Sequence, residues 1–253
     1  AYAGDAITTG YENVCIGQGA GGNFTAYNEN TFIGRNAGSG AITAGQCVAI
    51  GASTLTGAAS ISGTVAVGYQ SLSAVTSGQR NVAVGQQSGL ETTLGDDNIA
   101  IGYQSMTALT VTSGIDKNIA IGNFAMDGAT TGAHADNILI GYGSGGGAWD
   151  TSNAVTKNIG IGNLTMAGNM DGNADNIAIG YSALNDLTTG NQNICIGRGA
   201  GGAITDSDSC VIIGKQAGDA ITGSGVADGT VLIGTGAGSA ITDGAGNLAI
   251  GYQ

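Results

Sequence analysis

The chain has 253 residues, of which 49 are glycine and none is proline, and only 9% are charged. Six Lys and Arg residues against 18 Asp and Glu residues give a formal net charge of −12, which excludes the basic face that nucleic acids or anionic membrane surfaces require. No apolar run is long enough to span a bilayer, the glycines follow no collagen period, and the 42% of hydrophobic residues disfavours disorder. We therefore expect neither nucleic-acid binding nor membrane insertion.

One short motif recurs along the whole chain, as in the segment Asn-Ile-Ala-Ile-Gly at 98–102. Its glycine, taken below as position 0 of each repeat, occurs at intervals of 17 to 21 residues with a base period of 17. A fixed period of this kind predicts stacked coils, and we expect residues 1–253 to form a single array. The repeat glycines are Gly17, Gly34, Gly51, Gly68, Gly85, Gly102, Gly122, Gly141, Gly162, Gly180, Gly197, Gly214, Gly234 and Gly251.

The four residues before each glycine predict a short strand. Position −1 is always Ile or Val, position −3 is Val, Ile or Leu except at Thr31, and position −2 is usually small. This alternation predicts a strand with its β-branched residues facing inward. Position −4 is Asn in ten repeats, which predicts a ladder of side-chain amides from coil to coil.

A second segment follows each glycine. Position +3 is Ala, Ser or Thr, position +4 is Gly, Leu or Met, and an aliphatic-Thr pair such as Val75-Thr76 stands near position +7. The segment predicts a second short strand between glycine turns. The expected fold class is therefore all-β, a parallel β-solenoid or β-roll of about 14 coils with two short strands per coil.

The motifs at 98–105 and 176–184, such as Asn-Ile-Ala-Ile-Gly-Tyr-Gln-Ser, resemble the repeats of bacteriophage tail fibres and of the heads of trimeric autotransporter adhesins. This resemblance implies a homotrimeric, extracellular or virion-surface rod that is used for attachment to a cell-surface glycan or protein receptor. It implies a structural protein, and we expect no enzymatic activity and no cofactor. The alternative is a self-assembling extracellular filament whose subunits stack end to end.

The repeat departs from its own pattern between 102 and 180, where inserted residues predict enlarged loops. These loops contain the only His and the only Trp, so His134, Trp149 and Asp150 are candidates for a receptor-contact loop. Tyr at position +1 of five repeats could add further rings. The alternatives are that Trp149 packs over an open side of a coil or at a trimer seam, and that His134 is a solvated loop residue.

Other residues with reactive chemistry favour structural roles. A single histidine cannot supply a His-based triad or a multi-His metal site within one chain, and we expect no metal. The Asp-rich turns, such as Asp206-Ser-Asp208, match no calcium-loop pattern and favour solubilising turns, although Ca²⁺ binding stays open. Cys15, Cys47, Cys195 and Cys210 are expected to be small core residues rather than disulfides or zinc ligands. Since residue 1 is Ala rather than Met, we expect a processed product or a segment of a longer fibre.

Overall fold

The computed structural model describes residues 2–40, 42–43, 45–57, 60–90, 95–107, 114–129, 132–149, 153–222 and 227–253. The chain divides into two compact units, Ala1–Phe124 and Ala125–Gln253. Each unit is described by itself, and a single array over residues 1–253 stays a prediction. Within the described residues every regular element is a β-strand.

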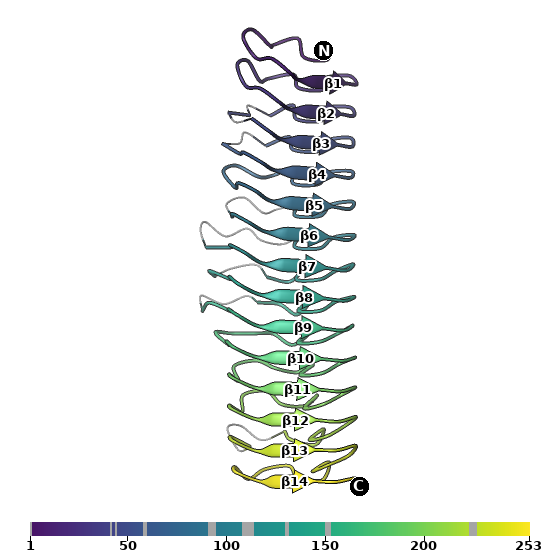
Figure 1. Cartoon of the computed structure of the whole chain (residues 1–253), viewed down its shortest axis with the longest axis vertical. Helices are drawn as coiled ribbons and strands as arrows, with labels where there is room; N and C mark the ends of the chain where they lie inside the picture. The colour runs from purple at the N-terminus through teal and green to yellow at the C-terminus, as the bar shows by residue number, and fades with distance from the viewer. Residues whose placement is uncertain are drawn as a thin grey trace. The chain divides into compact units, whose positions relative to one another are not determined.

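Each unit is a parallel β-solenoid with one three-residue strand in each coil, and its strands lie side by side in sequence order (Figure 1). The strands of the first unit are β1 (Val14–Ile16), β2 (Thr31–Ile33), β3 (Val48–Ile50), β4 (Val65–Val67), β5 (Val82–Val84), β6 (Ile99–Ile101) and β7 (Ile119–Ile121). Those of the second unit are β8 (Ile138–Ile140), β9 (Ile159–Ile161), β10 (Ile177–Ile179), β11 (Ile194–Ile196), β12 (Val211–Ile213), β13 (Val231–Ile233) and β14 (Leu248–Ile250). The all-β solenoid fold with coils of about 17 residues is thereby confirmed.

The register of the strands absorbs the irregular repeat lengths. Val82 pairs with Ile99, a step of 17 residues, whereas Ile99 pairs with Ile119, a step of 20, and Ile138 pairs with Ile159, a step of 21. All pairs keep positions −3, −2 and −1 aligned. Inserted residues are therefore accommodated between strands, and the strand column itself is unbroken within each unit.

The prediction that the β-branched residues face inward is wrong. The central residue of each strand, at position −2, faces the interior and is buried in every strand except the half-buried ones of β1 and β14, whereas positions −3 and −1 are partly or fully exposed. The reason is the narrow coil, since the space beside the strand is already filled by positions +3 and +4. Only a side chain as small as that of Ala83 or Ala100 fits there in most coils.

Positions −2 and +4 share this interior space by size. A Cβ at Gly38 would lie 2.6 Å from the ring of Phe32, and one at Gly145 would lie 2.5 Å from Cδ1 of Leu139. Pairs with a large −2 and a glycine at +4 are Cys15/Gly21, Phe32/Gly38, Leu139/Gly145, Cys195/Gly201, Ile212/Gly218 and Leu232/Gly238. Pairs with a small −2 and a large +4 are Ala49/Leu55, Ala66/Leu72, Ala100/Met106, Ala120/Met126, Gly160/Met166 and Ala178/Leu184.

One coil breaks this rule and contains a void. Ala83 and Gly89 are both small, and together with Leu72 and Met106 from the coils on either side they line a cavity of about 10 Å³. The cavity is where the missing +4 side chain would stand. Its position supports the view that −2 and +4 fill one shared space.

The amide ladder predicted at position −4 is confirmed. Oδ1 of Asn81 accepts hydrogen bonds from the backbone N–H of Asn98 at 2.9 Å and from its Nδ2 at 3.2 Å, and Asn98 accepts in the same way from Asn118. A second ladder of this kind runs from Asn137 through Asn158, Asn176 and Asn193. These amides are buried, so each bond also satisfies a polar group that would otherwise be costly inside the coil.

The predicted second strand does not form in the described residues. The segment around Val75 makes isolated backbone bonds, such as Ser60 N–H to the Thr76 oxygen at 3.0 Å, and the only bridges outside the named strands join Ala135, Thr156 and Ala174. The second strand is also absent from the described residues between β1 and β6, where successive strands are 17 residues apart, so the local backbone conformation and not the insertions prevents it. The coil instead turns through left-handed residues, as at Gly68, Gln70 and Leu72 with φ of 133°, 56° and 47°.

Two features require glycine at position 0: the backbone of the next coil lies close to its Cα, and its φ is positive. At Gly85 φ is 139°, and a Cβ there would lie 2.3 Å from the carbonyl oxygen of Gly102 in the next coil. Most repeat glycines of the two units meet the same obstacle. Any larger residue would both strain the backbone and push two coils apart.

Candidate functional site

Each unit carries an apolar sheet face, here called the outward face, which is formed by positions −3 and −1 of every strand. In the first unit it consists of Val14, Ile16, Thr31, Ile33, Val48, Ile50, Val65, Val67, Val82, Val84, Ile99, Ile101, Ile119 and Ile121. In the second unit it consists of Ile138, Ile140, Ile159, Ile161, Ile177, Ile179, Ile194, Ile196, Val211, Ile213, Val231, Ile233, Leu248 and Ile250. All are aliphatic except Thr31, and none is buried.

Such a face is unusual for the exposed surface of a soluble protein. Parallel sheets are normally covered on both sides, and contiguous exposed apolar patches beyond a few hundred Å² mark interaction sites. Side chains such as Ile50, Ile101 and Ile161 are 36–39% exposed although they belong to interior coils. The outward face therefore has the composition of an interface, and sequence reasoning missed it because it assigned these residues to the core.

His134 and Trp149 lie inside the second unit rather than on its surface. Both side chains are 0% exposed, and their rings meet edge to face with centroids 5.2 Å apart. Nδ1 of His134 accepts a hydrogen bond from the backbone N–H of Val155 at 3.1 Å. Trp149 packs against the turn at Gly145, where a Cβ would lie 3.0 Å from its Cζ2.

This burial corrects the expectation of a solvated loop histidine, and it favours packing as the role of Trp149. The inserted segments thus place two rings in the interior, where they pack against each other. In this folded state neither side chain is available to a receptor at the surface. Asp150, the third candidate, lies outside the described residues, as do parts of the predicted enlarged loops, namely 108–113, 130–131 and 151–152.

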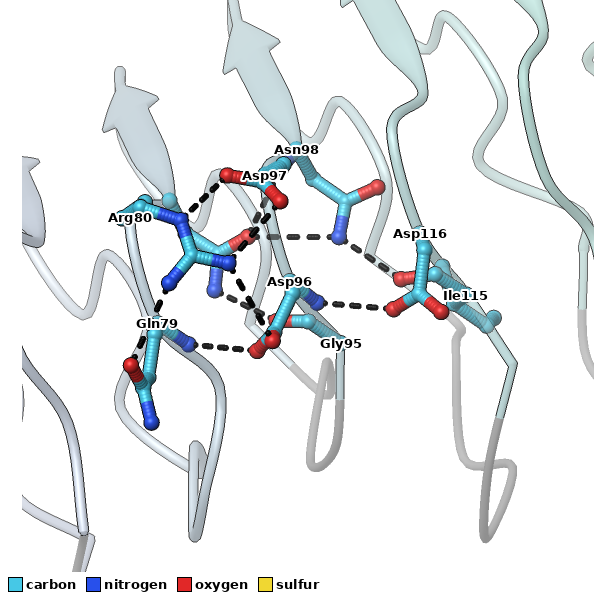
Figure 2. Close-up of polar contacts among 9 residues, drawn as sticks. Gln79, Arg80, Gly95, Asp96, Asp97, Asn98, Ile115 and Asp116 are labelled. Carbon is cyan, nitrogen blue, oxygen red and sulfur yellow. Dashed lines mark hydrogen bonds and ion pairs between the residues drawn. The ribbon is translucent and has the colours of Figure 1, made fainter.

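The clearest charged cluster is on the first unit, at the turn that precedes the strands (Figure 2). Nε of Arg80 donates a hydrogen bond to Oδ1 of Asp97 at 2.6 Å, and Nη2 of Arg80 donates one to Oδ2 of Asp97 at 2.9 Å. Nη2 also lies 3.4 Å from Oδ2 of Asp96. Asp96 also accepts a hydrogen bond from the backbone N–H of Gln79 at 2.9 Å, and Asp116 accepts one from that of Asp96. Each carboxylate thus links its own coil to the preceding one.

The electrostatics of this cluster follow from the ion pair. The hydrogen bonds and charge of Arg80 lower the pKa of the Asp97 carboxyl, and Asp97 in turn raises the pKa of Arg80. Both side chains are well exposed, so solvent screens the pair. The arrangement is a clamp between neighbouring coils.

The remaining reactive groups are structural in the described part of the chain. All four cysteines are free thiols, and three of them are buried; burial raises the pKa of the Cys195 thiol strongly. No group of three or more His, Cys, Asp or Glu residues in the described ranges is arranged to hold a metal ion. Nor does any described helix have the length and apolarity to cross a membrane.

Comparison with known proteins returned no match. No family model fits the chain, and neither a curated protein nor a solved structure is significantly similar to it. The surfaces of the two solenoid units are therefore the basis for the proposed function.

Proposed function

We propose that this chain is a non-enzymatic structural segment of an attachment fibre at a virion or cell surface, and that it works as a homo-oligomer, with the homotrimer as the expected form. The observation that supports the proposal is the outward face. A column of paired aliphatic side chains, repeated in every coil, is partly exposed, while position −2 of each strand faces the interior. Covering this face removes apolar surface from water, at about 25 cal/mol per Å².

A second copy of the chain is the partner that fits this face best. The aliphatic pairs recur once per coil, at the strand spacing of about 4.8 Å. A partner that packs against many coils must repeat at the same interval, and another copy of the same array does so. Since aliphatic side chains make up almost the whole face, contact between like faces also brings no like charges together.

The attachment role fits the way in which the coils are joined. Amide ladders, carboxylate clamps and a parallel strand column connect each coil to its neighbours, which gives a stiff support for exposed turns. The association with a virion or cell surface comes from the resemblance of the repeats to tail fibres and adhesin heads. The alternative, a filament built by end-to-end stacking, uses the coil ends instead of the outward face.

The two alternatives differ in how mass depends on concentration. We expect light scattering of the 253-residue chain to give a constant mass of three chains over a wide concentration range, with short particles in electron micrographs. A mass that rises steadily with concentration, together with long threads, would replace the attachment fibre by the filament. A monomer at every concentration would overturn both.

A further inference from the structure

A column of exposed tyrosines runs beside the outward face, at position +1 directly after the repeat glycine. In the first unit Tyr69 and Tyr103 stand two coils apart with Gln86 between them, and in the second unit Tyr142 and Tyr181 stand two coils apart with Asn163 between them. The four rings are 46%, 37%, 52% and 54% exposed. The same alternation of a ring, an amide and a ring thus occurs independently in both units.

Backbone hydrogen bonds fix the spacing within each column. The carbonyl of each +1 residue accepts from the N–H of position +2 in the next coil, as in Gln87 to Tyr69 at 2.8 Å and Gln104 to Gln86 at 3.1 Å. The second unit repeats this with Leu164 to Tyr142 at 2.9 Å and Ser182 to Asn163 at 3.0 Å. With one strand spacing per coil, the backbones that carry the two rings of a pair are therefore separated by roughly 9.5 Å along the stack.

The side chains beside the first pair of rings are neutral, whereas Arg198 occupies position +1 in the coil that follows Tyr181. The ring of Tyr103 is braced edge to face by Phe124, with centroids 5.3 Å apart. Oδ1 of Asn163 accepts from the backbone N–H of Tyr142 at 3.0 Å, while its Nδ2 makes no hydrogen bond with any described residue. The exposed Gln86 side chain makes none either, so both amides keep hydrogen-bonding groups for a ligand.

The geometry points to a binding surface for a neutral, extended β-1,4-linked polysaccharide on each of these columns. The apolar C–H face of a pyranose stacks on an aromatic ring, and two sugars of an extended β-1,4-linked chain advance by nearly the distance between the paired tyrosines. The sugar between the two stacked ones would meet the amide of Gln86 or Asn163. A net charge of −12 disfavours anionic polymers, and an α-1,4-linked chain curls and cannot follow a straight column. The inference rests on the proposed attachment role and specifies its ligand.

Calorimetric titration of the 253-residue chain with cellohexaose, chitohexaose and maltohexaose tests this assignment. We expect binding of at least one β-linked hexasaccharide and none of maltohexaose. Tyr69→Ala or Tyr103→Ala should each weaken binding to the first column about two- to tenfold, as expected for the loss of one ring contact. A variant that carries Tyr69→Ala, Tyr103→Ala, Tyr142→Ala and Tyr181→Ala should abolish binding. Tyr11→Ala is the matched control, because Tyr11 is an exposed tyrosine outside the column and its loss should change nothing.

Three results would overturn the assignment: no binding of either β-linked oligosaccharide, equal binding of maltohexaose, or an equal loss with Tyr11→Ala. Light scattering of the same samples separates this inference from the proposed function. An oligomer that binds no oligosaccharide overturns the glycan surface alone, and a monomer that binds overturns the homo-oligomer alone. If the Tyr69→Ala, Tyr103→Ala pair changes the mass, the rings belong to the interface between copies and the glycan assignment is wrong.

Discussion

His134 and Trp149 illustrate how single residues adapt the coil to an insertion. The two rings lie in the interior of the second unit, and the His134 ring is held by the backbone N–H of Val155. The Nε1 group of Trp149 has no hydrogen-bond partner among the described residues, which costs about 1–3 kcal/mol for a buried donor. The large apolar area of the indole has to outweigh that cost.

Truncation of this ring should therefore be severe. We expect Trp149→Ala to lower the free energy of unfolding by about 3–5 kcal/mol, and Trp149→Phe to cost much less because a ring remains and the unpaired donor is removed. Denaturant unfolding followed by circular dichroism measures both, and thiol labelling of the buried Cys195 gives a second readout within the same unit. Equal stability of Trp149→Ala and the unmodified chain would mean that the ring is not in the core.

The Arg80–Asp97 pair allows a prediction about pH. Arg80 lowers the pKa of Asp97 in the folded chain, so the pair stabilises the fold above the ordinary pKa of an aspartate, and this contribution is lost as the pH falls through the lowered value. In Arg80→Ala, the pKa of Asp97 should rise toward the ordinary value. Titration of the carboxyl carbon by NMR checks this; an unchanged pKa would show that the ion pair does not persist in solution.

At the scale of the element, one coil is a strand, a left-handed turn and an interior shared between positions −2 and +4. The coil with Ala83 and Gly89 has the only described pair in which both residues are small, and a cavity of about 10 Å³ lies there. In the coil of Ala178, by contrast, Leu184 already occupies the shared space.

Enlarging position −2 should therefore have opposite effects in these two coils. We expect Ala83→Val to raise the free energy of unfolding by about 0.5–2 kcal/mol because it fills the cavity. The matched substitution Ala178→Val should lower it by about 1–3 kcal/mol through overpacking. Thermal or denaturant unfolding of both variants decides the matter, and a change of the same sign in both would refute the shared-space rule.

The sequence predicts the elements better than it predicts their faces. The β-branched residues around Gly102 and its equivalents locate all the strands, and the Asn residues of position −4 predict the amide ladder. Their orientation could not be obtained from alternation alone, because alternation is the same whichever face is buried. The signal that does identify the interior is the size relation between −2 and +4, as in Phe32 with Gly38 and Ala66 with Leu72.

The sequence pattern predicted the candidate contact residues less well than it predicted the strands. A loop insertion suggested an exposed His134 and Trp149, but both rings lie in the interior. The second strand was inferred from an aliphatic-Thr pair such as Val75-Thr76. The backbone on either side of this pair passes through left-handed residues, Leu72 and Arg80, and no continuous ladder forms in the described residues. The first error arises where one coil differs from the next, which a repeat average conceals.

At the scale of the whole molecule, the outward face decides how the chain acts. Each solenoid unit turns position −2 of its strands inward and leaves the aliphatic residues of positions −3 and −1 partly exposed. An isolated chain would expose an aliphatic column on each unit to water. In the proposed oligomer, association through these columns gives a stiff, multivalent support that displays the tyrosine columns in several copies, and multivalent display strengthens attachment without any new contact.

The most direct test compares the mass of the chain with that of a variant altered on the outward face. In Val65→Asp, Val82→Asp, two carboxylates replace partly exposed residues of neighbouring strands. The control Thr25→Asp, Thr76→Asp adds the same charge in the segments between strands. We expect light scattering to give three chains for the unmodified protein and the control, and a single chain, with an unchanged circular dichroism spectrum, for the outward-face variant. An unmodified chain that is monomeric, or an outward-face variant that keeps the mass of three chains, would contradict the account.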